Sequence, residues 1–230
     1  LKACEKAIRA QFGEERFASL PRNNPAASLA LGALLSYLHE TQKTDLSYIK
    51  DLEYYEQGRF MELDLSARRN LELTETIRAK EKRGSLLWVL DKTKTAMGAR
   101  NLRAWLTRPL RDVAAIERRL GAVEALTKNT VAREELILSL SGISDMERLI
   151  GRIAYGTAGG RDFASLRNSI EKIAEVKAQL APFSAGRLHE LDGELDPLAD
   201  IARRIRETLV DEPPFSVREG GFIRPGYNAE

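Results

Sequence analysis

The sequence predicts a mainly α fold, an elongated bundle of helices that carries one or two small β-hairpins. Three observations support this class. Apolar residues recur at intervals of three and four over most of the chain, which places them on one face of a helix. Capping residues precede several of these stretches. The segments that connect the stretches are short, so consecutive helices can lie side by side.

Composition fits an ordinary globular protein. The 230 residues are enough for one large domain or two small ones. Apolar residues make up 43% and charged residues 30%, so disorder of the whole chain is not expected. The net charge of +2 indicates no particular partner.

Two helices are expected in the first 40 residues. The first, over residues 1–12, carries a stripe formed by Cys4, Ile8 and Phe12. The cysteine on this stripe is expected to act as a small buried residue. Asn24 suits the N-cap of the second helix and Pro25 its first position. This helix is expected to end near Glu40.

Residues 46–63 differ from the helical pattern. Aromatic and β-branched residues lie on both sides of Gln57 and Gly58, which predicts a β-hairpin. Asp64 then precedes a new helical stretch, so a helix is expected to follow it.

The helical signals become clearer after residue 111. Asp112 can cap a helix. Ser144 and Glu147 have the spacing of a capping box, in which the serine accepts from a backbone amide and the glutamate reaches back. Residues 157–160 form a loop, and Asp162 can cap the helix after it.

The last helix is expected to start at Asp196 and Pro197. It should end at residues 211–214, because their consecutive prolines cannot continue a helix. A short hairpin is expected beyond it, with its turn at Gly220 and Gly221.

Sequence motifs for catalysis, a cofactor or a metal are missing. The single cysteine excludes a disulfide within the chain and a cysteine-rich zinc site. A phosphate-binding loop needs Gly-x-x-x-x-Gly-Lys-Ser/Thr, and Gly151 and Gly156 are followed by Thr157 instead of lysine. His39 and His189 belong to no metal-binding motif and are expected on solvated helix faces. We therefore predict no catalytic, cofactor-binding or metal-binding residue and no enzymatic activity in this chain.

The sequence contains no targeting or membrane segment. No apolar run approaches the roughly 20 residues that span a bilayer, so no membrane partner is expected. The first residues lack the apolar core of a signal peptide. Because the chain also begins without methionine and ends without a terminal signal, we expect it to be a piece of a longer protein.

Basic residues are concentrated in residues 66–119, where 14 Arg and Lys face 6 Asp and Glu. One interpretation is a DNA-facing surface, since such a region can bind phosphates through counterion release. Arg100, Arg103 and Arg108 would be its contacts. The other interpretation is a solvated helix face, or arginines that pair with acidic groups elsewhere in the fold. The first interpretation leaves open that the chain is a standalone helical module that binds nucleic acid.

The segment 84–110 combines this charge with two apolar runs. Trp88 lies in the run from Leu86 to Leu90, and Trp105 lies in a second run. Both tryptophans are expected in the core because they lie inside apolar runs. Neither belongs to the interleaved basic and aromatic pattern of a single-strand binding surface.

Four blocks of the sequence carry a resemblance to a known family: "FMELDLSARRNLELTETIR", "GSLLWVLDKTKTAMGARNLRAWLTRPLRD", "ISDMERLIGRIAYGTAGGRDFASLR" and "EPPFSVREGGFIRPGYNAE". They resemble the central region of bacterial MutS, the family that recognises DNA mismatches. They occur in the family's order within residues 24–230. The resemblance implies that residues 1–45 are the end of a connector domain, residues 46–210 a helical core or lever domain, and residues 211–230 the approach to a clamp domain.

The resemblance also implies a mechanical role for the segment 84–110. It would be a stiff junction between two helices of the lever, with Gly98 allowing close backbone approach or an unusual dihedral. The expected junction residues are Trp88, Leu90, Met97, Gly98, Leu102, Trp105 and Leu106. Such a lever would link mismatched-DNA binding to ATP hydrolysis at sites outside this chain.

The whole protein implied by the resemblance would bind ATP and Mg²⁺ and act as a DNA-dependent ATPase. Its partners would be a mismatched duplex, a second copy of itself and downstream repair factors such as MutL. Its location would be the bacterial cytoplasm, in association with the nucleoid.

Overall fold

The predicted mainly α fold is confirmed by a computed structural model. The residues that the structure describes are 1–20, 24–42, 46–52, 54, 58, 60–215 and 217–227. They form helices α1 to α11 and one short 3-10 helix, and no strand occurs among them. The chain divides into two compact units, Leu1–Arg59 and Phe60–Glu230.

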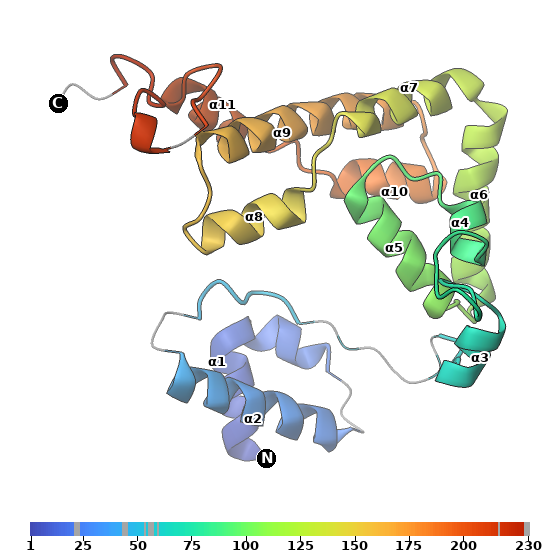
Figure 1. Ribbon diagram of the computed structural model, residues 1–230. Coiled ribbons are helices and arrows are strands. Elements are labelled where there is room, and N and C mark those ends of the chain that lie inside the picture. The colour runs from blue at the N-terminus through green and yellow to red at the C-terminus, as the bar shows by residue number, and fades with distance from the viewer. Residues whose placement is uncertain are drawn as a thin grey trace. The chain divides into compact units, whose positions relative to one another are not determined.

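The first unit consists of α1 (Lys2–Ala18) packed against α2 (Pro25–Thr41). Both helices are coloured blue in Figure 1. The predicted start of α2 at Pro25 is confirmed, and its end lies one residue beyond Glu40. Within α1 the helical backbone breaks at Gly13, where φ is 81° and ψ is 170°, so the first helical stretch stops close to the predicted residue 12.

The core of this unit lies between the two helices. Ile8 of α1 is fully buried and Leu35 of α2 nearly so. Cys4 is half-buried and lies against Gly32 of α2. The predicted stripe therefore faces α2, with its burial greatest at Ile8.

The second unit contains the remaining helices, which Figure 1 labels in chain order. They are α3 (Leu65–Asn70), α4 (Leu86–Leu90), α5 (Ala96–Thr107), α6 (Val113–Lys128), α7 (Thr130–Ser141), α8 (Met146–Ala154), α9 (Gly160–Leu180), α10 (Gly186–Glu194), α11 (Ala199–Thr208) and the 3-10 helix η1 (Val217–Glu219).

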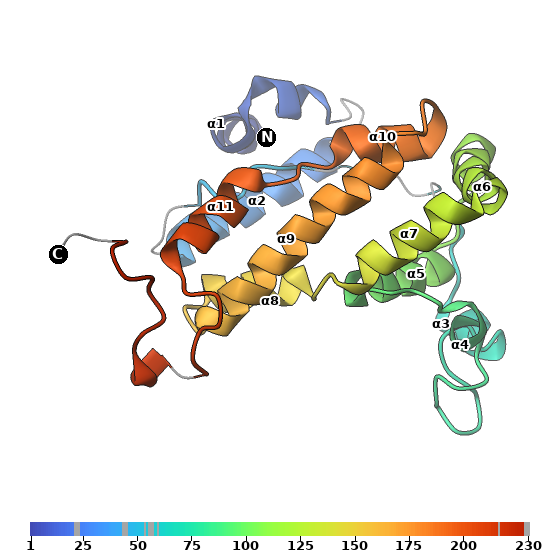
Figure 2. The same cartoon turned by 90° about the horizontal axis from the view of Figure 1, so that it is seen from above.

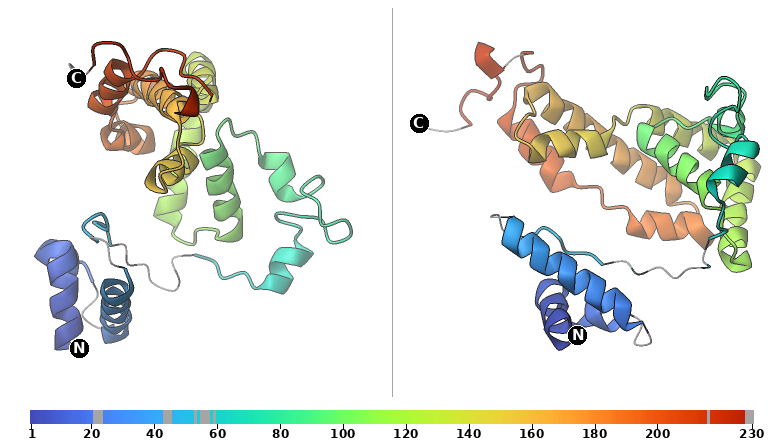
Figure 3. Two further views of the ribbon diagram at one scale, coloured as in Figure 1. Left: turned by 60° about the vertical axis from the view of Figure 1, so that its left-hand side comes forward. Right: turned by 60° about the horizontal axis from the view of Figure 1, so that its bottom comes forward.

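Helix α9 is the central element of the second unit. It contacts α7, α8, α10 and α11, and Figures 1 and 2 show these helices arranged around it, with two further views of the same ribbon in Figure 3. At 21 residues it extends over about 30 Å. Helix α6 contacts α7 and α10, and α4 contacts α5.

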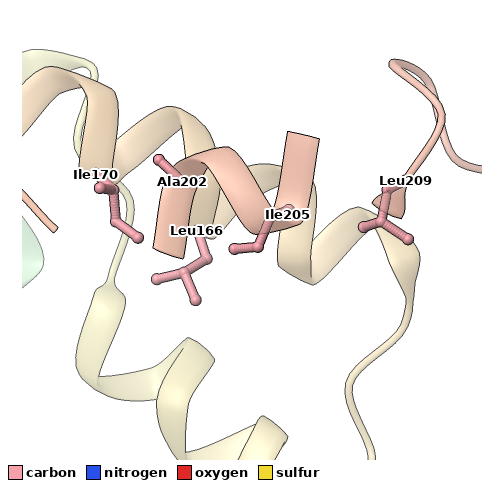
Figure 4. Close-up of a cluster of buried hydrophobic side chains, with 5 residues drawn as sticks. All are labelled: Leu166, Ile170, Ala202, Ile205 and Leu209. Carbon is pink, nitrogen blue, oxygen red and sulfur yellow. The ribbon is translucent and has the colours of Figure 1, made fainter. Parts of the chain in front are cut away.

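Two buried clusters lie along α9. The first joins the N-terminal half of α9 to α11 and is drawn in Figure 4; its buried members are Leu166, Ile170, Ala202, Ile205 and Leu209. Half-buried residues of α8 pack against it. The second joins the C-terminal half of α9 to α7 and α10, and its buried members are Leu136, Val176, Leu180 and Leu188. Because both clusters include α9, a single continuous helix connects them.

Several predicted helix starts are confirmed by their hydrogen bonds. Asp64 accepts from the Ala67 amide at 2.6 Å, although α3 is only six residues long. Asp112 accepts from the Ala114 amide at 3.2 Å and caps α6. At both positions, an aspartate directly before an apolar stripe correctly predicts where the helix begins.

The predicted capping box at Ser144 is wrong by one residue. Asp145 is the N-cap of α8 and accepts from the Arg148 amide at 3.3 Å. Ser144 is engaged elsewhere, since its amide donates to Ser169 Oγ at 3.0 Å and its hydroxyl lies 2.9 Å from Ser165 Oγ. The tertiary contact with α9 thus decides which residue caps α8.

Two later helices also begin away from their predicted residue. Asp162 lies inside the first turn of α9, where it accepts from the Gly159 amide at 2.8 Å. The last helix, α11, begins after Leu198, which has a left-handed backbone with φ of 46°. Asp196 accepts from the Leu198 amide at 2.9 Å and so stabilises the turn before α11 rather than its first residue.

The first predicted hairpin, over residues 46–63, falls partly outside the described residues, Gln57 of its turn included. Of its described residues, Phe60 pairs with Leu110 in an isolated antiparallel bridge. The second predicted hairpin does not form among the described residues. Near the C-terminus, Ile223 pairs with Leu209 at the end of α11. The composition of an extended segment predicts its conformation, but its partner is chosen by the tertiary fold.

Candidate functional site: the α4–α5 junction

Around the junction between α4 and α5, the start of each helix is fixed by a side-chain cap. Ser85 is fully buried, accepts from the Trp88 amide at 3.3 Å and so begins α4. Thr95 accepts from the Gly98 amide at 3.0 Å and begins α5. The ends of both helices are thus set by short polar side chains.

Asp91 holds the turn between the two helices. Its carboxylate accepts from the Thr93 hydroxyl at 2.6 Å and pairs with Lys82. These bonds hold the pKa of Asp91 at about 2; the hydrogen bond from Lys82 is the largest cause. The loop before α4 and the turn after it are therefore tied together.

Gly98 is a position of close approach. A Cβ at this position would lie 2.9 Å from Thr95 Oγ1, which is tighter than ordinary contact. Its backbone is not in the left-handed region. Of the two expected reasons for glycine here, the structure shows close approach to the cap.

The expected burial of the tryptophans is wrong. Trp88 is 48% exposed and Trp105 is 43% exposed. Leu90 is 47% exposed, while Met97, Leu102 and Leu106 are half-buried. Apolar runs contain residues on every side of a short helix, so the run alone could not select the buried side.

The buried residue of α4 is Leu87, which the sequence did not single out. Its side chain is 3% exposed, and its amide donates to the Leu73 carbonyl at 2.9 Å. Leu73 is itself buried. Backbone hydrogen bonds therefore tie the start of α4 to the segment that follows α3.

Trp105 has a polar partner in place of a core. The guanidinium of Arg119 on α6 lies 3.8 Å from the ring centroid of Trp105. This is the geometry of a cation–π contact. It links the C-terminal half of α5 to α6.

Arg100 does not present a free charge. Its Nη1 and Nη2 atoms donate to both oxygens of Asp145 at 2.8 and 2.7 Å, and Nη2 also donates to Glu147 at 2.6 Å. These bonds raise the pKa of Arg100 and lower that of Asp145 to about 2. Of the two interpretations of the basic stretch, pairing with distant acidic groups holds at this residue.

Arg103 and Arg108 are exposed, and no ion pair is recorded for either among the described residues. Elsewhere in the basic stretch, Lys82 pairs with Asp91 and Arg118 lies 3.8 Å from Glu190. The three arginines singled out together thus differ in surroundings, with one in an ion cluster and two facing solvent.

The described residues contain no group of three or more His, Cys, Asp and Glu placed to hold a metal ion. A cavity of about 660 Å³ before α9 is lined by Arg152 and Arg161. Arg152 pairs with Asp162 at 2.8 Å, and Arg161 donates to the Pro213 carbonyl at 3.1 Å, so both arginines have partners within the chain. Among the described helices, none has the length and apolar character needed to cross a bilayer.

Residues 66–230 match the family described as MutS domain III. This match includes the α4–α5 junction and both clusters along α9. The chain belongs to the MutS family.

Proteins named DNA mismatch repair protein MutS are similar to nearly the whole chain. The protein from Listeria monocytogenes is 44% identical over 201 residues, which are 87% of this chain and 23% of that protein. The protein from Brevibacillus brevis is 48% identical over 199 residues, or 86% of this chain and 23% of that protein. The protein from Desulforamulus reducens is 44% identical over 220 residues, or 96% of this chain and 25% of that protein. The chain thus spans about a quarter of the length of these MutS proteins.

Proposed function

We propose that this chain is the end of a connector and the first part of a lever in a MutS-type mismatch repair protein. In this role it passes conformational shifts between a mismatched-DNA site and an ATPase site, both outside residues 1–230. The observation that carries the proposal is the match of residues 66–230 to MutS domain III.

The packing around α9 supports a mechanical role. One helix of 21 residues is shared by two buried clusters, one with α8 and α11 and the other with α7 and α10. Burying each large apolar side chain contributes roughly 1.5–3 kcal/mol. Helices fixed in this way move together, so a shift imposed at one cluster reaches the other, provided that two arrangements exist.

Coupling between the two sites would be reciprocal. If a mismatch changes the affinity for ATP, then ATP changes the affinity for the mismatch by the same factor. In the longer protein, ATP and Mg²⁺ would be held by residues outside this chain. The expected second copy and a downstream factor such as MutL also belong to the proposal for the longer protein, as does a cytoplasmic, nucleoid-associated location.

A test of the lever is to soften α9 without changing its packed face. Ala174 and Ala178 are exposed on α9, and replacing both by glycine costs roughly 1 kcal/mol per site in helix stability. The matched control replaces both by serine, which keeps Cβ. We expect the glycine variant of the longer protein to lose part of the increase in ATP hydrolysis caused by mismatched duplex. Hydrolysis without DNA should stay unchanged. An unchanged response in the glycine variant, with faster amide exchange in α9, would rule the lever out.

The second candidate function is a helical module that binds nucleic acid directly. The observation that favours it is the exposure of Arg103 and Arg108, for which no ion pair is recorded among the described residues. Against it, Arg100 is committed to Asp145 and Glu147. Fluorescence anisotropy of a labelled duplex separates the two functions, because only the module would bind it at about 0.15 M salt.

A further inference from the structure

Helix α5 is held to the rest of its unit by few apolar contacts. None of its 12 residues is buried, whereas α9 buries five residues along its length. The helix that α5 contacts most is α4, which buries only Leu87. Hydrophobic packing alone therefore does not fix the position of α5.

The N-terminal half of α5 is attached to α8 by one ion cluster. Arg100 binds Asp145 through two parallel hydrogen bonds and Glu147 through a third, although these acids lie 45 and 47 residues away in the sequence. A bidentate guanidinium–carboxylate pair fixes the orientation of both groups as well as their distance.

The acidic partners of Arg100 belong to the start of α8, and α8 is held on α9. Asp145 caps α8, and the neighbouring Ser144 donates from its amide to Ser169, which is fully buried in α9. Half-buried residues of α8 also pack on the cluster formed by α9 and α11. Arg100 thus joins a loosely packed helix to the best-packed part of the unit.

The C-terminal half of α5 has a different attachment. Trp105 stacks with Arg119 of α6, and beyond the helix the Met61 amide donates to the Pro109 carbonyl at 2.7 Å. The isolated bridge between Phe60 and Leu110 lies at the same end. If the contacts of Arg100 break, these contacts still hold the C-terminal end of α5 in place.

We propose that Arg100, Asp145 and Glu147 form an ionic latch that closes the N-terminal half of α5 onto α8 and opens by rotation about the Trp105 end. The latch rests on the proposed lever function, in which it is the contact that connects the α4–α5 junction to α8 and α9. The side chain of Asp145 is 22% exposed, but that of Arg100 is 49% and that of Glu147 is 68% exposed, so water and salt reach the contact from the side of Arg100 and Glu147. Exposed ion pairs are weak and screened by salt, so a modest strain or a competing anion can open this one.

The two tryptophans make the latch measurable in this chain. Trp88 on α4 and Trp105 on α5 are the only tryptophans, so tryptophan emission, excited selectively over the tyrosines, reports on this segment alone. Amide hydrogen exchange of residues 96–104 reports on opening of α5, and exchange in α9 serves as the internal reference.

Asp145→Asn is the most specific test of the ion pair. Asparagine caps helices as well as aspartate does, so the start of α8 is kept while the charge that faces Arg100 is removed. Arg100→Gln removes the other side of the latch. The matched control is Glu124→Gln, which removes an exposed ion pair with Lys128 that lies within α6 and joins no two helices.

We expect amides of α5 to exchange about threefold to tenfold faster in Asp145→Asn and Arg100→Gln, with α9 unchanged and with shifted tryptophan fluorescence. In the unaltered chain, raising NaCl from about 0.05 to 1 M should reproduce the change, whereas Arg100→Gln should not respond to salt. Glu124→Gln should behave as the unaltered chain. Unchanged α5 exchange in both latch variants, with normal melting, would overturn the latch.

The proposed latch and the proposed lever function can be contradicted by different results. If α5 exchanges faster in Arg100→Gln but the longer protein keeps its full response to mismatched DNA, the latch has no part in coupling and its proposed role is overturned. If α9 softened by glycine leaves that response intact, the lever itself is wrong, whatever the exchange of α5 shows.

Discussion

Ile170 and Trp105 illustrate how burial decides the cost of losing a side chain. Ile170 is 1% exposed in the cluster between α9 and α11, whereas Trp105 is 43% exposed. We expect Ile170→Ala to lower the free energy of unfolding by about 2–5 kcal/mol, the usual cost of a cavity in a core. Trp105→Ala should cost clearly less, since it loses partial burial and one cation–π contact worth roughly 0.5–1 kcal/mol.

Urea denaturation of the two variants checks this order. Leu138→Ala, at a residue that is 72% exposed, is the control and should change the free energy of unfolding by less than about 0.5 kcal/mol. A loss for Trp105→Ala as large as that for Ile170→Ala would show that Trp105 is buried in solution, as the sequence alone predicts.

The pKa of Asp91 predicts an acid-sensitive turn after α4. Hydrogen bonds from Lys82 and Thr93 lower this pKa to about 2, below the value of about 3.9 expected for the unfolded chain. A lowered folded pKa stabilises the fold fully above the unfolded value, and this contribution disappears as pH falls from about 4 to 2. We expect Asp91→Asn to destabilise the chain at pH 7 and to make its stability less dependent on pH in that window.

The test is a series of thermal melts between pH 7 and pH 2. The difference in melting temperature between the unaltered chain and Asp91→Asn should be constant above about pH 5 and shrink toward pH 2. A difference that stays constant over the whole range would contradict a charged role for this carboxylate.

At the scale of elements, replacing a glycine by alanine is expected to have opposite effects on stability in two helices. A Cβ added at Gly32 of α2 would lie 2.7 Å from Cys4 Cα of α1, a backbone atom that cannot move alone. A Cβ added at Gly121 of α6 would meet nothing within 4 Å. We expect Gly32→Ala to destabilise the packing of α1 and α2 by about 1–3 kcal/mol. Gly121→Ala should stabilise the second unit by about 0.5–1 kcal/mol through helix propensity.

Amide exchange resolved along the chain separates these effects. Gly32→Ala should accelerate exchange in α1 and α2 only, and Gly121→Ala should slow exchange in α6. Equal protection of α1 in the Gly32→Ala variant would mean that the two helices do not approach as closely as the structure places them.

The same scale shows what local sequence could and could not predict. Caps at Asp64 and Asp112 were predictable, because a capping side chain bonds to amides only two or three residues away. The cap of α8 was not, since Ser144 is drawn to α9 by Ser165 and Ser169. The second hairpin was not predictable for a related reason, since Ile223 pairs with Leu209 at the end of α11 and not across the turn at Gly220 and Gly221.

At the scale of the whole molecule, charge in the sequence was a poor guide to free charge. Arg100 belongs to the most basic stretch, yet its partners lie 45 and 47 residues away on another helix. The exposure of Trp88 and Trp105 was equally beyond local pattern, because it depends on which helices cover α4 and α5. Family resemblance rests on the order of whole blocks, so it identified the MutS region without needing these tertiary details.

The pairing of Arg100 leads to a prediction about DNA. A duplex could bind through Arg100 only by displacing Asp145 and Glu147. Arg103 and Arg108 are therefore the two arginines of this set that face solvent. Few phosphate contacts give weak binding with only a shallow dependence on salt, because the slope grows with the number of phosphates neutralised. We therefore expect no measurable binding of this chain to a labelled duplex at about 0.15 M salt by fluorescence anisotropy.

The control variant replaces Arg100, Arg103 and Arg108 by alanine. If the chain binds tightly at that salt and the triple variant does not, the chain is a nucleic-acid-binding module and the latch competes with DNA for Arg100. If neither binds, the result favours the lever function, in which Arg100 holds α5 on α8 through Asp145 and Glu147. If the chain binds only below that salt, the slope of log affinity against log salt counts the phosphates involved, because each one neutralised adds about 0.9 to the slope for a duplex.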